Sequence, residues 1–202
     1  MRSICVFCGS SFGNHPAYRE LAQVTGEAIA CLDLRLVYGG GRVGLMGVIA
    51  DAALAAGGTV IGVIPASLVE REVEHSGLSE LHVTETMHER KALMADLSDG
   101  FLALPGGYGS LDELCEILTW AQLGFHAKPV ALLGTLGFWH SLLAAFDHAV
   151  ATGFLSPDHR AMVLADDIDL SSGATEVVRS MLTTMAQWNP PLTSKWADRD
   201  DR

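Results

Sequence analysis

Positive charge is scarce in this chain. Its 202 residues include 13 lysines and arginines against 24 aspartates and glutamates, which gives a formal net charge of −11. Three of the cations are lysines: Lys91, Lys128 and Lys195. An acidic surface repels the phosphate backbone of nucleic acids, so we expect no DNA or RNA partner. A small anionic ligand would have to be held by local backbone N–H groups and a few arginines.

Targeting and membrane-spanning patterns are also lacking. The N-terminus enters a strand pattern at Ser3, without the basic, apolar and cleavage regions of a signal peptide. No uninterrupted apolar run reaches the ~18 residues expected of a membrane helix. We therefore expect a cytoplasmic protein that does not bind membranes.

Cysteine is rare, and its spacing matches no zinc ribbon. The four cysteines are Cys5, Cys8, Cys31 and Cys115, and Cys5-x-x-Cys8 has no second pair at that spacing. Cys5 also falls inside a strand pattern. Core thiols in a reduced protein are the favoured interpretation, and redox or metal use is the alternative.

Two hydrolytic signatures are missing as well. The eight histidines show no His-Glu-x-x-His or other metal-ligand spacing. Ser10 and Ser11 follow an apolar run, but no Gly-x-Ser-x-Gly elbow exists. Metal-dependent and serine hydrolysis are therefore poorly supported, and we expect no metal site.

The chain does contain a regular alternation of short apolar runs and longer helical patterns, in a sequence that is 49% hydrophobic. Strands are expected over Ile4–Phe7, Arg35–Tyr38, Val60–Ile64, Leu81–Thr84, Phe101–Leu104, Val130–Leu133 and Met162–Ala165. Helices are expected over Pro16–Cys31, Leu45–Ala56, Met87–Leu97, Ser110–Leu123, Phe138–Ala151 and Leu170–Met185.

This rhythm predicts the α/β class: a Rossmann-like, doubly wound parallel sheet flanked by helices on both faces. We expect a single domain over residues 1–188 and a frayed tail over 189–202. In such sheets ligands gather beyond the carboxyl ends of the strands.

A glycine turn after one predicted strand is the most informative motif. Pro105 to Glu113 reads Pro-Gly-Gly-Tyr-Gly-Ser-Leu-Asp-Glu and leads into a helix predicted to start at Ser110. Glycines let the backbone approach a ligand, and free N–H groups at a helix start attract anions. The motif therefore predicts a phosphate site with a carboxylate beside it.

A second glycine cluster, Gly39 to Gly47, occupies the same strand-to-helix position and satisfies G-x-G-x-x-G. Small residues needed for packing alone are the alternative to a phosphate- or ribose-facing loop. No acid ends the following strand, since Glu70 is the first after Pro65, and this argues against NAD. Two such loops in one sheet could place two helix N-termini around a single anion.

The charged residues near these loops each have a structural alternative. Ser110-x-x-Glu113 has the spacing of a capping box, which on spacing alone is favoured over catalysis. Asp112 is most simply a first-turn acid stabilised by the helix dipole. Arg90 and Lys91 lie near a helix start, either on a solvated face offset by Glu85 and Glu89 or with Arg90 facing an anionic ligand.

Taken together, these motifs resemble the Lonely Guy (LOG) family of cytokinin-activating phosphoribohydrolases. Pro105–Glu113 matches the family pattern Pro-Gly-Gly-x-Gly-Thr-x-x-Glu, with Ser110 in place of the threonine. The resemblance covers about Ser3 to Met185 and includes Phe7–Ser11, Tyr38–Gly47, Met87–Lys91 and Thr119–Gly124. The Ser110 hydroxyl should preserve phosphate bonding.

The resemblance implies hydrolysis of the N-glycosidic bond of an adenosine 5′-monophosphate, with or without an N6 substituent, to free base and ribose 5-phosphate. It also implies a homodimer, no redox cofactor, and Arg90 and Glu113 as the catalytic pair. The implied substrate-binding residues are Glu72, Lys91, Gly106, Gly107, Tyr108, Gly109, Ser110, Thr119, Gly40, Gly41, Gly9 and Ser10.

Two other functions are weighed against this one. A non-catalytic nucleotide sensor or carrier could use the same frame, and an NAD-dependent oxidoreductase is disfavoured by the missing strand-end acid. The "lysine decarboxylase" label of some relatives requires a Schiff-base lysine. Lys195 lies in the predicted tail and Lys128 precedes a proline in a loop, so neither suggests one.

Overall fold

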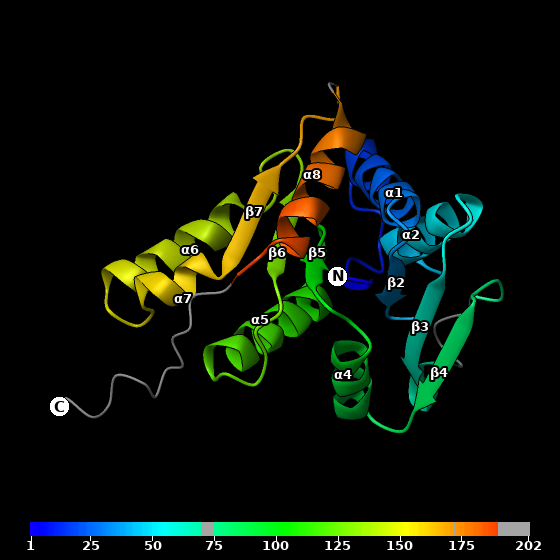
Figure 1. The fold of residues 1–202 in the computed structure, drawn as a ribbon, viewed down its shortest axis with the longest axis horizontal. Helices are drawn as coiled ribbons and strands as arrows, with labels where there is room; N and C mark the ends of the chain where they lie inside the picture. The colour runs from blue at the N-terminus through cyan, green and yellow to red at the C-terminus, as the bar shows by residue number, and fades with distance from the viewer. Residues whose placement is uncertain (70–74, 172, 190–202) are drawn as a thin grey trace.

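Parallel strands form the centre of the molecule (Figure 1). The computed structural model describes residues 1–69, 75–171 and 173–189. Within these residues seven strands form one sheet in the order β4-β3-β2-β1-β5-β6-β7, and every neighbouring pair is parallel. The strands are β1 Ser3–Phe7, β2 Arg35–Tyr38, β3 Val60–Pro65, β4 Glu80–Thr84, β5 Phe101–Ala103, β6 Val130–Gly134 and β7 Val163–Asp167.

Helices cover both faces of this sheet. On one face lie α1 Pro16–Cys31, α2 Gly44–Ala55 and α8 Ala174–Ala186, and on the other lie α4 Met87–Asp96, α5 Tyr108–Gln122 and α6 His140–Ala151. Two short helices, α3 Ala66–Val69 and α7 Pro157–Ala161, lie in connections. None of the helices that the structure describes is long and apolar enough to cross a membrane.

Two hydrophobic cores follow from this layering. Side chains of the sheet alternate between the faces: Ile4 and Val6 belong to the core under α1, α2 and α8, whereas Cys5 and Phe7 belong to the core under α4 and α5. All five residues of β1 are buried, as expected for a central strand covered on both sides. The continuous apolar runs in the sequence therefore correspond to strands that are covered by helices on both faces.

The expected fold is confirmed, and the main differences lie at element ends and in short elements. The last helix begins at Ala174, not at Leu170, because Gly173 adopts a left-handed conformation with φ 70° just before it. The single turns α3 and α7 were not expected, since four or five residues are too few to show a helical period. The predicted tail lies outside the described residues from 190 onward.

The strand order determines where a ligand can bind. From β1 the chain proceeds to β2, β3 and β4 on one side of the sheet, and then returns to place β5 on the other side of β1. The connections that follow β1 and β5 therefore diverge, which leaves a crevice at the carboxyl ends of these two strands. Both Gly9 and the Pro105–Glu113 motif follow strands that border this crevice.

Candidate active site

A cavity of about 250 Å³ lies beyond the carboxyl ends of the central strands. Its polar wall contains Arg90 from α4, Glu113 from α5, and residues Gly107–Ser110 at the start of α5. Met46, Leu68 and Met87 supply an apolar wall, and Gly9 and Ser10 line it from the loop after β1. The structure thus places the predicted catalytic pair and the second glycine motif around one space.

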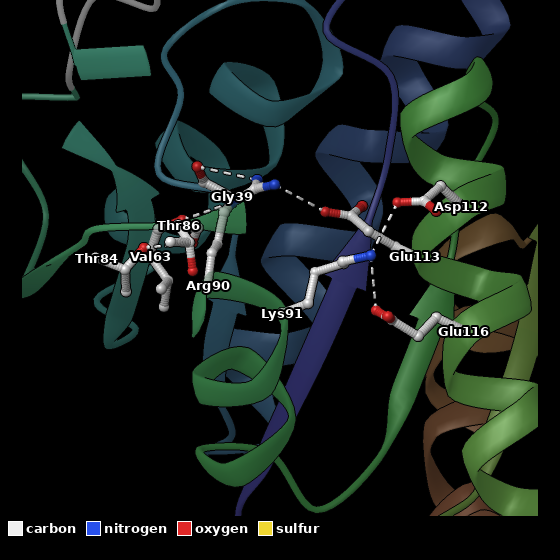
Figure 2. Close-up of polar contacts among 9 residues, drawn as sticks. All are labelled: Gly39, Val63, Thr84, Thr86, Arg90, Lys91, Asp112, Glu113 and Glu116. Atoms are coloured by element: carbon white, nitrogen blue, oxygen red, sulfur yellow. Dashed lines mark hydrogen bonds and ion pairs between the residues drawn. The ribbon is translucent and has the colours of Figure 1, made fainter. Parts of the chain in front are cut away.

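Arg90 is buried and held by three polar contacts (Figure 2). Its Nε donates to the carbonyl of Val63 at 3.0 Å, and its Nη2 donates to the carbonyl of Gly39 at 3.4 Å. Its Nη1 lies 3.1 Å from Oε1 of Glu113. The side chain therefore joins the ends of β2 and β3 to α5, so a solvated helix face does not describe Arg90.

The start of α4 explains why Arg90 points into the crevice. Thr86 caps this helix, because its hydroxyl accepts from the N–H of Glu89 while the Glu89 carboxylate accepts from the N–H of Thr86. The sequence had suggested that Glu89 could offset Arg90 and Lys91 on a solvated face. In the structure its carboxylate is instead used within the cap. The capping box fixes the first turn of α4, and Arg90 is the next residue after that turn.

Glu113 does not cap its own helix, contrary to the spacing-based alternative. Helix α5 begins at Tyr108, two residues earlier than expected, and its N-cap Gly107 makes no side-chain cap bond. Glu113 therefore lies in the second turn, is 9% exposed, and meets Arg90. Asp112 is likewise not a first-turn acid, since it lies four residues after the helix start, and it binds Lys91.

The first turn of α5 forms part of the cavity wall. The first N–H groups of a helix have no intrahelical acceptor, and here they belong to Tyr108, Gly109 and Ser110, which all line the cavity. The buried Ser110 hydroxyl packs against Gly106, so only glycine fits there. These amides and this hydroxyl lie beside the Glu113 carboxylate, and helix-start amides are groups of the kind that bind anions.

The first glycine cluster serves the site mainly through packing. Gly44 has φ 61°, and a Cβ on it would collide with the backbone of Ser10 and Ser11. The N–H of Leu45 donates to the Gly9 carbonyl at 2.9 Å, so the start of α2 binds the β1 loop. This N–H of α2 is therefore used within the protein, and the expectation of two helix N-termini around one anion stays a prediction.

Gly40 and Gly41, which were expected to contact substrate, are buried and are not among the residues that line the cavity. A Cβ on Gly40 would lie 3.2 Å from Cβ of Ile64, so this glycine lies close against β3. Gly39, which was not among the candidates, contributes instead through its carbonyl oxygen.

Lys91 follows Arg90 on α4 but faces other partners than Glu113. Its Nζ is 3.1 Å from Oδ2 of Asp112 and 2.9 Å from Oε2 of Glu116. Desolvation lowers the pKa of this ammonium, but the hydrogen bonds and charges of Glu116 and Asp112 raise it by more, so the net shift is upward. Lys91 is therefore held as a cation against α5.

Thr119 is not brought to this cavity. Thr119 lies on an exposed part of α5 and lines a different cavity of about 260 Å³, together with Phe146, Phe154 and Met162. Its hydroxyl donates to the carbonyl of Cys115 within the helix. Glu72 lies outside the described residues.

A third cavity of about 240 Å³ adjoins the first along Gly9, Ser10 and Gly107. Phe12, Tyr18 and Phe138 give it an aromatic wall, and the rings of Tyr18 and Phe138 meet edge to face at 5.8 Å. Sequence reasoning did not identify these aromatic residues, because they come from the loop after β1, the first turn of α1 and the loop after β6, and they share no motif.

Cys5 and Cys8 agree with the core-thiol interpretation, whereas Cys31 and Cys115 are exposed. Cys5 and Cys8 are buried, all four cysteines are free, and burial raises the pKa of Cys5 and of Cys8 so that the thiolate is disfavoured. Among the residues described, no three His, Cys, Asp or Glu side chains are grouped as metal ligands would be.

Comparisons with known proteins give close relatives along most of the chain. Residues 46–176 match a family model described as "Possible lysine decarboxylase". The chain is 50% identical over 181 residues to a cytokinin riboside 5′-monophosphate phosphoribohydrolase of Rhodococcoides fascians, covering 89% of this chain and 90% of that protein. It is 47% identical over 180 residues to the Arabidopsis thaliana phosphoribohydrolase LOG1, covering 89% and 82%.

Solved structures support the fold at lower identity. A molybdenum cofactor binding protein of Rippkaea orientalis superimposes with a TM-score of 0.66 at 22% identity, over 92% of this chain and 97% of that one. The molybdenum cofactor carrier protein of Chlamydomonas reinhardtii gives a TM-score of 0.65 at 24% identity, over 90% and 98%. At this identity the likeness concerns the fold alone.

Proposed function

Because this chain belongs to the Lonely Guy family of cytokinin riboside 5′-monophosphate phosphoribohydrolases, we propose that it hydrolyses the N-glycosidic bond of an adenosine 5′-monophosphate. The substrate base is adenine or an N6-substituted adenine. The products are the free base and ribose 5-phosphate. The observation that supports this reaction best is the buried Arg90–Glu113 pair beside the exposed amides of the α5 start.

The two parts of the cavity wall suit the two parts of such a substrate. The amides of Tyr108, Gly109 and Ser110 bind the 5′-phosphate, which supplies binding energy remote from the reacting carbon. Nucleosides without the phosphate are therefore expected to be poor substrates.

Glu113 is proposed to act on the sugar. Cleavage of a ribosyl–base bond develops positive charge on the ribose, and a nearby carboxylate stabilises that charge and orients the attacking water. Arg90 holds the carboxylate in place with a guanidinium that is itself fixed by two backbone carbonyls. Substrate binding would let the same guanidinium meet the ribose or its phosphate.

The reaction is tested by incubating the protein with AMP, with N6-isopentenyl AMP and with adenosine, and measuring the free base. We expect base from at least one nucleotide and a much lower kcat/KM for adenosine. Equal kcat/KM for adenosine and AMP would contradict the phosphate anchor. Tight nucleotide binding with no release of base would instead support the sensor or carrier alternative.

The catalytic role of Glu113 is tested by Glu113→Gln. We expect kcat to fall at least about 10²-fold, because the amide carries no charge to stabilise the sugar cation. Circular dichroism and the melting temperature report whether the variant folds. A folded variant with wild-type kcat would remove Glu113 from the mechanism.

A lysine decarboxylase activity has little support in the lysines described. A pyridoxal Schiff base needs an amine that can lose its proton, and the raised pKa of Lys91 opposes that. Lys128 donates to the carbonyl of Ala95. The family description therefore misstates the chemistry proposed for this chain.

We also propose a homodimer whose interface includes the cavity lined by Thr119. Phe154, at this cavity, is 88% exposed, and Phe125, in the turn after α5, is 74% exposed, so the surface offers apolar side chains that a partner would cover. Thr119 lies six residues beyond Glu113, about 9 Å along the helix at ~1.5 Å per residue. We propose that Thr119 meets the nucleotide bound by the partner subunit.

Subunit mixing tests this arrangement. Glu113→Gln and Thr119→Ala proteins are refolded together and assayed. If Thr119 acts across the interface, each heterodimer regains one intact site and activity reappears. If both residues serve the same subunit, no site is intact and the mixture stays inactive.

A cytoplasmic location is proposed from the sequence. The four cysteines are unpaired in the structure, as they would be in a reducing compartment. Fractionation of cells that express a tagged chain is the direct measurement.

A further inference from the structure

Three carboxylates face two cations where α5 meets α4 (Figure 2). Arg90 and Lys91 are neighbours on α4, and they reach different acids on α5: Arg90 meets Glu113, whereas Lys91 meets Asp112 and Glu116. Asp112 and Glu116 are four residues apart and lie on the same side of the helix. Lys91 therefore bridges the turn of α5 that carries Glu113.

Helix α4 buries few of its side chains, so polar contacts contribute to holding it in place. Among its ten residues, the buried ones are Arg90, Met94 and Ala95. At its far end, Lys128 Nζ donates to the carbonyl of Ala95 at 2.8 Å. Ion pairs thus join α4 to α5 alongside the apolar packing of Met94 and Ala95, and we expect that losing the Lys91 pairs would let Arg90 move relative to Glu113.

The surroundings make the Lys91 contacts effective. The Lys91 side chain is 11% exposed and the Glu116 side chain is 23% exposed, so water screens this pair less than it screens an ordinary surface pair. Asp112, with 63% of its side chain exposed, adds a weaker contact. Without a cation between them, three carboxylates within five residues of α5 would repel one another.

We propose that Lys91 is a positioning residue: clamped by Asp112 and Glu116, it keeps α4 in register with α5 and holds Arg90 against Glu113. Glu116 and Asp112 thereby act on the reaction without touching substrate. This inference rests on the proposed hydrolysis and assigns Lys91 a role other than the substrate contact implied by the family resemblance.

The test compares three variants of the full-length chain: Lys91→Met, the double variant Asp112→Asn/Glu116→Gln, and the triple variant that combines them. The clamp predicts that Lys91→Met and the double variant each lower kcat on AMP by up to about 10²-fold, as expected for a misplaced catalytic group. The triple variant should be no worse than Lys91→Met, since all three changes break the same contacts. Glu20→Gln, which removes an exposed carboxylate from α1, is the matched control and should retain wild-type kcat.

Binding of ribose 5-phosphate, measured by calorimetry, separates the clamp from a direct contact. The clamp predicts Kd values within about 3-fold of wild type for all variants, because the phosphate amides are untouched. A direct phosphate contact predicts at least tenfold weaker binding for Lys91→Met and full kcat for the double variant, in which the ammonium is released. Either of those results would overturn the proposal.

Failure of the proposed function is a separate result. A wild-type protein that binds ribose 5-phosphate but releases no base refutes the hydrolysis. In that case the distances between α4 and α5 in crystals of the wild type and the double variant still test the clamp. An unchanged Arg90–Glu113 contact in the double variant would refute it.

Discussion

Gly39 leaves the space that the Arg90 guanidinium occupies. A Cβ at this position would collide with Nη2 of Arg90 and lie 3.2 Å from Sδ of Met46. The Gly39 backbone is outside the left-handed region, so its requirement for glycine comes from the neighbouring side chain and not from backbone strain. At the residue scale, the contact between Arg90 and Glu113 therefore depends on the absence of a Cβ atom at Gly39.

Gly39→Ala is predicted to displace the Arg90 guanidinium from its contact with Glu113. We expect kcat/KM on AMP to fall about 10²-fold, because a small misplacement of a group in the active site can slow a reaction that much. Steady-state kinetics and the melting temperature are the measurements. Gly77→Ala serves as the control, because its added Cβ would make only an ordinary contact at 3.5 Å. Wild-type kcat/KM in Gly39→Ala would show that Arg90 tolerates the shift.

At the scale of the element, α4 is organised from its N-terminus. The Thr86–Glu89 capping box fixes the first turn, and Arg90 and Lys91 follow directly. These two cations lie near a helix start, where the dipole disfavours them, and the three acids of α5 offset that cost. The cap of α4 thus positions two cations, and both of them form ion pairs with acids of α5.

Thr86→Ala is predicted to fray this first turn. Loss of an N-cap costs about 1 kcal/mol, which corresponds to a fall in melting temperature of about 2–4 °C for a chain of this size. Because Arg90 lies next to the frayed turn, kcat should fall as well. Thr86→Ser keeps the hydroxyl and should match the wild type in both measurements. Equal melting temperatures for the alanine and serine variants would show that the cap contributes nothing.

On the scale of the whole molecule, the dependence of stability on pH involves His126, which lies in the connection between α5 and β6. Its Nε2 donates to the carbonyl of Ile117 at 3.0 Å, and its Nδ1 accepts from the N–H of Lys128 at 3.1 Å. Desolvation by burial lowers the pKa of His126 below its ordinary value of 6.5, and the charge of Lys128 adds to this effect. The folded protein therefore holds the neutral ring.

This arrangement predicts a loss of stability in mild acid. As pH falls through 6.5, the unfolded chain takes up a proton at His126 that the folded chain resists, so the free energy of unfolding declines below that pH. His126→Gln should have a flatter profile of melting temperature between pH 7 and 5. The N–H of Arg2 is the main cause that lowers the pKa of Asp99 below its ordinary value of 3.8, so protonation of Asp99 reduces stability only at pH values below this range. Parallel profiles for the variant and the wild type would exclude His126 as the cause.

The sequence determined the fold and most of the site's composition. Runs such as Ile4–Phe7 are apolar throughout because both sides of a central parallel strand are buried, and this pattern is visible without coordinates. The Pro105–Glu113 motif likewise predicted an anion-binding helix start, because glycine and a free helix terminus are local properties of the chain.

Only the tertiary structure decided what the charged residues do. By spacing, Glu113 was more plausibly a cap than a catalyst, and Lys91 and Glu116 had no stated connection. The contact between Arg90 and Glu113, 23 residues apart, exists because the strand order puts β5 beside β1 and brings α4 and α5 to one face. Side-chain pairing across elements depends on this packing, and a local sequence pattern contains no information about it.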